Sequence, residues 1–267
     1  MDPVNDLAEL LDIAWDAAEI GRRLMTTTSP GRISAKSDRD LVTELDVRIQ
    51  HEIRDHLRRA TPGFGFLGEE DGGGVLASAG PVWVLDPIDG TSNFAHGLPL
   101  CVTSLGLVDD GEAVVGVVVA PFLGLAYHAM KDGGAYVNDA RIHARTNDEL
   151  GRAIVSLGDY DTGPDAAEGN RRRFAITRTL AENVERVRMV GSAALDLVWV
   201  ADGRTDACVM LSNKPWDTAA GVVIAREAGA VVTDLRGAPH TFSSGETVAI
   251  SPKLADPLRA LLARATN

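Results

Sequence analysis

The chain has 267 residues, and its 38 acidic and 26 basic residues give a formal net charge of −12. An acidic surface repels nucleic acids and anionic membranes, so we expect neither as the main partner. Hydrophobic residues make up 45% of the chain, which is enough for a core and excludes disorder as the main state. At roughly 150 residues per domain, this length fits one large domain or two small ones.

The sequence gives no sign of export, membrane insertion or a disulfide framework. Its first residues are acidic, with neither a basic nor an apolar leader region. The most apolar run, residues 113–126, is interrupted by two glycines and a proline and is too short to span a membrane. Cys101 and Cys208 lie among small and apolar residues, which is typical of buried free thiols. We therefore expect a cytoplasmic protein.

Hydrophobic periodicity predicts two helices in the first part of the chain. Apolar and small residues recur at helical spacing over residues 5–25. The polar segment over residues 26–38 predicts a loop. A second helix is predicted from about Arg39, because Ser37 and Asp40 resemble a capping box and apolar residues follow at every fourth position.

Strands are predicted in the middle of the chain, and helices alternate with strands after it. A short apolar run covers residues 82–85, and two longer runs flank Asp109-Asp110-Gly111, which is a hairpin signal. The further predicted strands cover residues 101–108, 112–120, 125–131, 135–138, 153–157, 208–211, 231–232 and 248–250. The further predicted helices cover residues 168–183, 192–203, 217–228 and 254–264. This order favours a layered α/β or α+β sandwich.

Three short segments place acidic residues next to the ends of predicted elements. The first, residues 68–71, contains Glu69 and, taken alone, is also typical of an exposed acidic loop. The second follows the strand at 82–85 and reads Asp86-Pro87-Ile88-Asp89-Gly90-Thr91. The third is Trp216-Asp217 at the predicted start of a helix, where an aspartate commonly caps the helix.

The second segment has the chemistry of a cation site. Pro87 fixes its own φ and holds Asp86 and Asp89 in a rigid turn, so both carboxylates can converge on one point, with the Ile88 carbonyl between them. Oxygen ligands of this kind suit a hard cation such as Mg²⁺. Backbone N–H groups after Gly90 suit a phosphate. The alternative is a plain turn in which the aspartates cap backbone donors.

The three segments support each other if they meet in the fold. Carboxylates that meet without a cation repel one another, so a metal site is the natural solution. The sequence has no Cys/His cluster with zinc spacing and no glycine-rich nucleotide loop. Zinc and a nucleotide-binding fold therefore have no support.

The order and spacing of these segments resemble the inositol monophosphatase family. The segments quoted above carry the resemblance, together with Lys36 to Asp46 and Val190 to Ala194, and it covers nearly the whole chain. It implies an α-β-α-β-α layered sandwich of the inositol monophosphatase and fructose-1,6-bisphosphatase type, and usually a homodimer. It also implies one catalytic unit, in which residues 1–145 carry the metal site and residues 146–267 the substrate side.

The resemblance further implies a lithium-sensitive, Mg²⁺-dependent phosphatase that hydrolyses inositol 1-phosphate or a similar small polyol phosphate. Glu69, Asp86 and the Ile88 carbonyl are the implied ligands of one Mg²⁺. Asp86, Asp89 and Asp217 are the implied ligands of a second, and Glu69 also reaches a third.

The resemblance assigns the remaining roles to residues near these ligands. Glu69, with a hydrogen-bonded Thr91–Asp46 pair, would orient the attacking water. Lys36 is a candidate phosphate or loop contact, with a solvated surface lysine as the alternative. The implied substrate-side residues are Asp89, Gly90, Thr91, Gly191, Ser192, Ala193 and Asp217.

Met210 departs from the family pattern. Members that act on inositol phosphates carry a ring-contacting glutamate seven residues before the aspartate of Trp-Asp, where this chain has Met210. Methionine cannot accept a strong hydrogen bond from a hydroxyl, so Asn213 or Lys214 is an alternative sugar contact. Histidinol phosphate, fructose 1,6-bisphosphate and nucleotide 3′-phosphates are alternative substrates. A catalytically idle regulator that binds metal or a partner protein is the alternative of another class.

Overall fold

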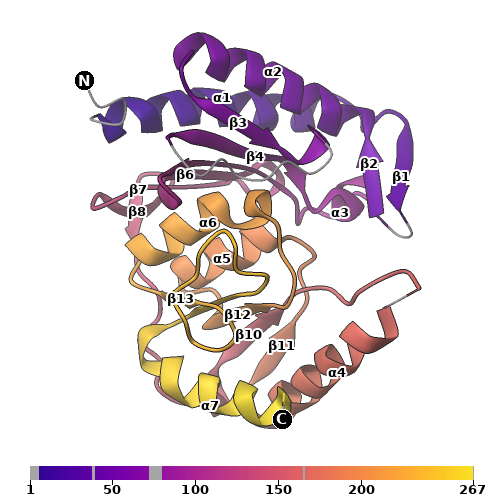
Figure 1. Cartoon of the computed structure of the whole chain (residues 1–267), viewed down its shortest axis with the longest axis vertical. Helices are drawn as coiled ribbons and strands as arrows, with labels where there is room; N and C mark the ends of the chain where they lie inside the picture. Colours follow the sequence, from indigo (N-terminus) through magenta and orange to yellow (C-terminus); the bar gives the residue numbers. More distant parts are fainter. Residues whose placement is uncertain (1–5, 38–39, 72–79, 165, 267) are drawn as a thin grey trace.

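The computed structural model describes residues 6–37, 40–71, 80–164 and 166–266, without the side chains of residues 35–37, 40 and 266. Its helices and sheets stack in the order α-β-α-β-α (Figure 1). The layered sandwich implied by the resemblance is thereby confirmed. No helix among the described residues is long and apolar enough to cross a membrane.

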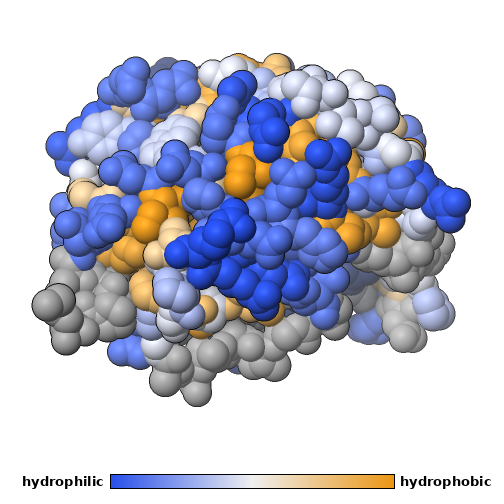
Figure 2. Space-filling model, turned by 90° about the horizontal axis from the view of Figure 1, so that it is seen from above, coloured by the Kyte–Doolittle hydropathy of each residue, from blue (hydrophilic) through white to orange (hydrophobic). Residues whose placement is uncertain are grey.

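Two long helices form the outer layer at one end of the molecule. They are α1 (Leu7–Thr27) and α2 (Glu44–Ala60). Both helices are amphipathic, and their leucines, isoleucines and alanines pack against the sheet beneath them. The face seen from above this layer is mainly hydrophilic, with scattered apolar residues (Figure 2).

The start of α2 differs from the prediction near Arg39, because the helix begins at Glu44. The Thr43 hydroxyl accepts a hydrogen bond from the Asp46 N–H, and the Asp46 carboxylate accepts one from the Thr43 N–H, 3.0 Å away. This reciprocal cap fixes the helix start. Ser37 lies at the end of a strand and not before a helix, and the predicted loop is partly a hairpin. Its strands are β1 (Ile33–Ser37) and β2 (Asp40–Thr43).

The second layer is a seven-stranded sheet in chain order. Its strands are β3 (Gly65–Gly68), β4 (Val82–Asp89), β5 (Val102–Asp109), β6 (Glu112–Ala120), β7 (Leu125–Met130), β8 (Gly134–Val137) and β9 (Ala140–Ile142). The predicted hairpin between β5 and β6 is confirmed, with Asp110 and Gly111 at φ 47° and 81°. The strand β3 was not predicted from the sequence, and its parallel pairing with β4 carries Glu69 to a position beside Asp86.

The third layer is a pair of helices between the two large sheets. They are α5 (Ala193–Ala201) and α6 (Pro215–Glu227). Gly106 and Gly116 are cross-strand partners in β5 and β6. A Cβ atom at Gly106 would lie 2.8 Å from Cβ of Ala219, and one at Gly116 would lie 2.6 Å from the carbonyl oxygen of Ala220. The glycine pair therefore allows α6 to lie directly on the sheet.

The last two layers are a five-stranded sheet and the helices that cover it. In sheet order the strands are β11 (Arg186–Arg188), β10 (Ile154–Leu157), β12 (Ala207–Met210), β14 (Thr247–Ile250) and β13 (Val231–Thr233). The helices are α4 (Ala166–Asn183) and α7 (Ala255–Thr266). Because β10 and β12 pair in parallel, their carboxyl ends lie side by side.

Candidate active site

The two aspartates of the Asp-Pro-Ile-Asp segment lie within the end of β4 rather than in a turn after it. Residues three apart on a regular strand point to opposite faces. Here the pairing of β4 with β5 shifts register between Asp86 and Asp89, around Pro87, and both aspartates line the same cavity. The expected turn is thus an irregularity of the strand, and it brings both carboxylates together as expected.

Gly90 ends this strand and begins the next element. Its φ is +89°, a left-handed conformation that favours glycine. A Cβ atom at this position would also lie 2.8 Å from the carbonyl oxygen of Leu100. The chain therefore turns here into the short helix α3 (Thr91–Ala95).

A cavity of about 190 Å³ collects the predicted metal ligands from separate parts of the chain. We call it the smaller cavity. All five residues that the resemblance assigns to metal ions line it, as do the predicted phosphate-binding residues Gly90 and Thr91. The full lining is Leu41, Glu69, Asp86, Ile88, Asp89, Gly90, Thr91, Ser92, Gly191 and Asp217.

The Asp89 carboxylate joins β4 to the start of α5. It accepts hydrogen bonds from the Ser192 hydroxyl at 2.6 Å and from the backbone N–H groups of Ala193 at 3.2 Å and Ala194 at 2.7 Å. Burial raises the pKa of Asp89 to about 6, although these three donors lower it. The predicted substrate-side residues Ser192 and Ala193 are thereby fixed next to the predicted metal ligands.

The other two aspartates have fewer donors. Asp86 is 3% exposed, and one of its oxygens has no hydrogen-bond partner within the described residues. Burial raises the pKa of Asp86 well above its ordinary value, and the charges of Glu69, Asp89 and Asp217 raise it further. Burial also raises the pKa of Asp217 to about 7, although the Lys214 N–H donates to it at 2.6 Å. These four carboxylates therefore repel one another.

This donor set suits a divalent cation. It consists of the carboxylates of Glu69, Asp86, Asp89 and Asp217 and the Ile88 carbonyl, and hard cations prefer such oxygen ligands. A cation relieves the repulsion and gives the unpartnered Asp86 oxygen a partner. Across the described ranges, no group of three or more His, Cys, Asp or Glu side chains is already arranged to hold a metal ion.

Thr91 and Asp46 form the predicted hydrogen-bonded pair. The Thr91 hydroxyl lies 3.1 Å from one Asp46 oxygen and 2.9 Å from the Ile88 carbonyl oxygen. The other Asp46 oxygen accepts from the N–H and the hydroxyl of Thr43. Burial raises the pKa of Asp46, although these hydrogen bonds lower it. The capping box of α2 thus fixes the Asp46 carboxylate, and this carboxylate in turn orients the Thr91 hydroxyl.

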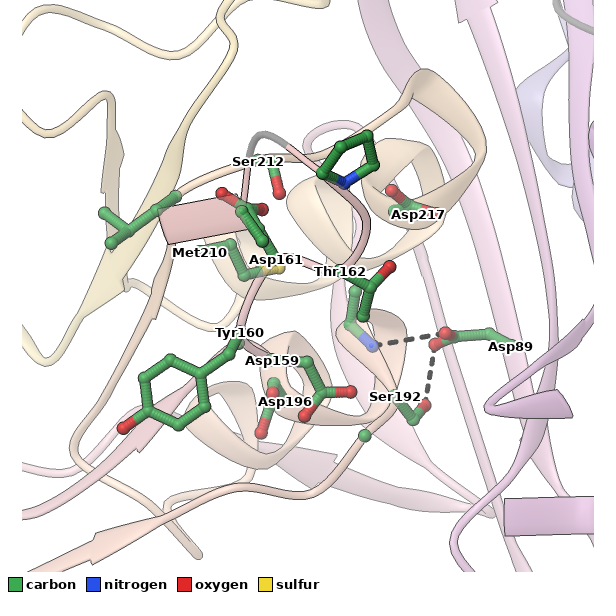
Figure 3. A pocket seen from close by; sticks show the side chains of 16 residues that line it. Asp89, Asp159, Tyr160, Asp161, Thr162, Ser192, Asp196, Met210, Ser212 and Asp217 are labelled. Atoms are coloured by element: carbon green, nitrogen blue, oxygen red, sulfur yellow. Dashed lines mark hydrogen bonds between the residues drawn. The ribbon is translucent and has the colours of Figure 1, made fainter. Parts of the chain in front are cut away.

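A second cavity, of about 600 Å³, adjoins the first (Figure 3). We call it the larger cavity. It shares three residues with the smaller cavity: Asp89, Gly191 and Asp217. Ala193 was predicted from the sequence to lie on the substrate side, whereas Asp159, Tyr160, Asp161 and Thr162 were not predicted. These residues follow the carboxyl end of β10. Sites in α/β folds commonly lie at the carboxyl ends of strands, which is the position that Asp86 also occupies.

The remaining candidates lie apart from the cavities or outside the described residues. Met210 lines the larger cavity and is 2% exposed. Asn213 and Lys214 line neither cavity. The amide of Asn213 is bound instead to the Ser244 carbonyl and the Thr247 hydroxyl. The structure thus gives no support to a sugar contact from this pair. The side chain of Lys36 lies outside the described residues.

Comparisons with known proteins agree with this geometry. The model of the inositol monophosphatase family matches residues 5–266. An inositol-1-monophosphatase of Mycolicibacterium smegmatis is 36% identical over 249 residues, 93% of this chain and 87% of that protein. A fructose-1,6-bisphosphatase/inositol-1-monophosphatase of Thermotoga maritima is 38% identical over 201 residues, 74% of this chain and 73% of that protein.

The likeness extends to solved structures. An inositol monophosphatase structure from Thermotoga maritima superposes with a TM-score of 0.86 at 31% identity, covering 96% of this chain and 97% of that one. The chain belongs to the inositol monophosphatase family. It is accordingly a phosphoric monoester hydrolase.

Proposed function

We propose that the chain hydrolyses inositol 1-phosphate or a similar small polyol phosphate, with Mg²⁺ bound in the smaller cavity. One observation carries the proposal. Four carboxylates and a backbone carbonyl line a small cavity that shares a wall with a cavity large enough for a leaving group. The names of the relatives, which include inositol-1-monophosphatases, support the same substrate class.

The metal ligands in this proposal are Glu69, Asp86, Ile88, Asp89 and Asp217. When bound, Mg²⁺ lowers the pKa of a water molecule and stabilises charge on the attacking and leaving oxygens. Two Mg²⁺ balance the four carboxylates, and a third gives the site a net positive charge. An acidic chain can therefore attract an anionic phosphate locally.

The chain's own groups bind the phosphate and orient the water. The Thr91 hydroxyl donates a hydrogen bond to Asp46, so the hydroxyl oxygen can accept a hydrogen bond from the attacking water. Glu69 lies on the same cavity wall and is the second group that orients this water. The backbone N–H groups of Gly90 and Thr91 bind the phosphate, and Ser192 and Ala193 face the leaving group.

Phosphate release tests this proposal. The protein is stripped with a chelator, returned to Mg²⁺ and assayed on inositol 1-phosphate, histidinol phosphate, fructose 1,6-bisphosphate and adenosine 3′,5′-bisphosphate. We expect the highest kcat/KM for inositol 1-phosphate, no turnover without metal, and inhibition by Li⁺ but not by K⁺. Absence of turnover on every substrate, with Mg²⁺ bound, would instead identify a catalytically idle member.

The retained carboxylates favour the enzyme over the idle member, because none of the implied ligands is replaced. The homodimer and the cytoplasmic location remain predictions. Sedimentation velocity at micromolar protein concentration measures the first, and fractionation of the source cells measures the second.

A further inference from the structure

The far wall of the larger cavity is built from the loop that follows β10. Gly158 lies beside Met210, because its N–H donates to the Val209 carbonyl at 3.0 Å and β10 runs parallel to β12. The next residue, Asp159, lines the cavity, and its carboxylate points toward the space in front of Ser192 (Figure 3). A carboxylate thus stands one strand away from Met210.

This wall is acidic and carries hydrogen-bond acceptors that lack a donor within the described residues. Asp159, Asp161 and Asp196 line it, and no Lys, Arg or His lines this cavity among the described residues. Asp196 is 2% exposed, and one of its carboxyl oxygens has no hydrogen-bond partner within the described ranges. The wall can therefore accept hydrogen bonds from a bound ligand in addition to those that the described residues donate.

Arg173 of α4 holds this wall in place from behind. Its side chain is buried at 5% exposure and does not line the cavity. The guanidinium donates to the Asp159 carbonyl at 3.1 Å, to the Asp161 carboxylate at 2.5 Å and to the Ser212 hydroxyl at 3.0 Å. One planar cation thereby joins the loops after β10 and β12, and its charge is balanced by Asp161 rather than by Asp159.

Further contacts with α4 fix the same loop. The Asn170 amide accepts from the N–H of Asp161 at 2.8 Å and donates to the carbonyl of Asp161 at 3.0 Å. The Tyr160 hydroxyl lies 3.0 Å from the Thr177 hydroxyl, and its ring packs against Phe174. Asp159 thus lies in a loop that several hydrogen bonds join to α4, and no described cation pairs with its carboxylate.

We propose that Asp159 determines specificity for the leaving group, and that Arg173 is the residue that positions it. Asp159 accepts a hydrogen bond from a donor on the leaving alcohol, which is a hydroxyl or a protonated amine. The same charge repels a leaving group that carries a second phosphate. The chain is therefore selective for monophosphates over bisphosphates, an inference that rests on the proposed phosphatase function.

The physical reason is the sign of charge on each side of the substrate. Metal ions make the smaller cavity favourable for one phosphate, whereas no cation among the described lining residues neutralises the far wall. When one phosphate of fructose 1,6-bisphosphate enters the smaller cavity, its second phosphate faces this wall. The second phosphate and the carboxylates of the wall are both negative, and their repulsion in a partly desolvated cavity weakens binding of the bisphosphate.

The test is a ratio of two substrates measured on the same Mg²⁺-loaded protein. We expect Asp159→Asn, which keeps the shape of the side chain, to lower the ratio of kcat/KM for inositol 1-phosphate to that for fructose 1,6-bisphosphate about tenfold or more. Asp148→Asn is the matched control, because Asp148 is exposed and lines neither cavity. The control keeps the wild-type ratio.

Histidinol phosphate distinguishes the two donors. A greater loss of kcat/KM on histidinol phosphate than on inositol 1-phosphate assigns a protonated amine, and the reverse assigns a hydroxyl. A wild-type ratio in Asp159→Asn, or a wild-type protein that prefers the bisphosphate, overturns the inference and leaves phosphatase activity standing. A wild-type protein without activity on any monoester contradicts the proposed function instead.

Arg173→Lys tests the positioning role. Lysine keeps the charge but cannot donate to three separated acceptors, so the same substrate ratio falls. If Arg173 acts through Asp159, the double variant with Asp159→Asn has the ratio of Asp159→Asn alone, within about twofold. A merely structural role lowers stability and kcat on both substrates and leaves the ratio unchanged, which contradicts the inference.

Discussion

Among single residues, Asp86 is the clearest case in which function opposes stability. Its carboxylate is buried, has an oxygen without a partner in the described residues, and lies near three other carboxylates. Burial of an uncompensated charge lowers the free energy of unfolding, and a bound cation would offset this cost. Asp89 is different, because Ser192 and two backbone N–H groups hold its carboxylate.

Asp86→Asn is therefore expected to stabilise the metal-free protein while abolishing phosphate release. Removal of one of four repelling carboxylates raises the free energy of unfolding by about 1 kcal/mol. If Mg²⁺ binds the native state as proposed, it raises the free energy of unfolding of the wild type, and it raises that of this variant less. Urea unfolding with and without Mg²⁺ measures both effects.

Asp148→Asn is the control, since it removes an exposed carboxylate from outside the cavities. It is expected to keep both the activity and the response to Mg²⁺. An Asp86→Asn protein that keeps wild-type turnover, or responds fully to Mg²⁺, would show that Asp86 is not a metal ligand.

The helices and strands that position the site could be predicted only where neighbouring residues in the sequence determine the local structure. The Asp110-Gly111 turn and the Asp86–Asp89 segment contain their own signals. The turn joins β5 to β6 as predicted, and both aspartates line the smaller cavity, although they lie within β4 rather than in a turn after it. The start of α2 was misplaced because two capping boxes compete in the sequence, and the hairpin pairing of residues 33–43 decides between them. Arg173 could not be assigned from sequence, because its three partners lie 12 or more residues away along the chain.

The contact of α6 with the sheet leads to a prediction at this scale. Gly116→Ala places a Cβ atom 2.6 Å from the Ala220 carbonyl oxygen, so α6 must move away from β6. Overpacking of this kind costs about 1–3 kcal/mol of stability. Because Asp217 lies in the first turn of α6, we expect kcat to fall as well. Thermal unfolding and phosphate release measure the two losses.

Gly151→Ala is the matched control, because a Cβ atom at Gly151 meets nothing within 4 Å and its φ is not positive. It is expected to change neither quantity. If Gly116→Ala were destabilised while its turnover stayed at the wild-type level, the position of Asp217 would not depend on this contact.

Over the whole molecule, the two halves of the sequence are interleaved in space. The helices α5 and α6 belong to the second half, yet they pack on the sheet of the first half, and a single apolar cluster contains Val102 and Val118 together with Leu195 and Ile224. Asp89 of the first half also accepts hydrogen bonds from the start of α5. Few surfaces remain along which the halves could separate, so we predict one cooperative unit.

Leu258→Ala tests this prediction at a distance. Leu258 is fully buried in α7, at the opposite end of the layers from Trp83 in β4. Truncation of a buried leucine costs about 2–5 kcal/mol. If the halves unfold together, the urea midpoint reported by Trp83 fluorescence falls as far as the midpoint from circular dichroism. Trp15, Trp199 and Trp216 are first replaced by Phe, so that only Trp83 reports.

Leu98→Ala is the control, because Leu98 is 50% exposed and its truncation leaves no buried void. It is expected to shift either midpoint far less. A Trp83 transition that stays at the parent midpoint in Leu258→Ala, while the circular dichroism separates into two steps, would mean that the halves unfold independently. The coincidence of the two probes matters because the proposed metal ligands come from both halves. Only a chain that folds as one unit holds Asp217 at a fixed distance from Asp86 and Asp89.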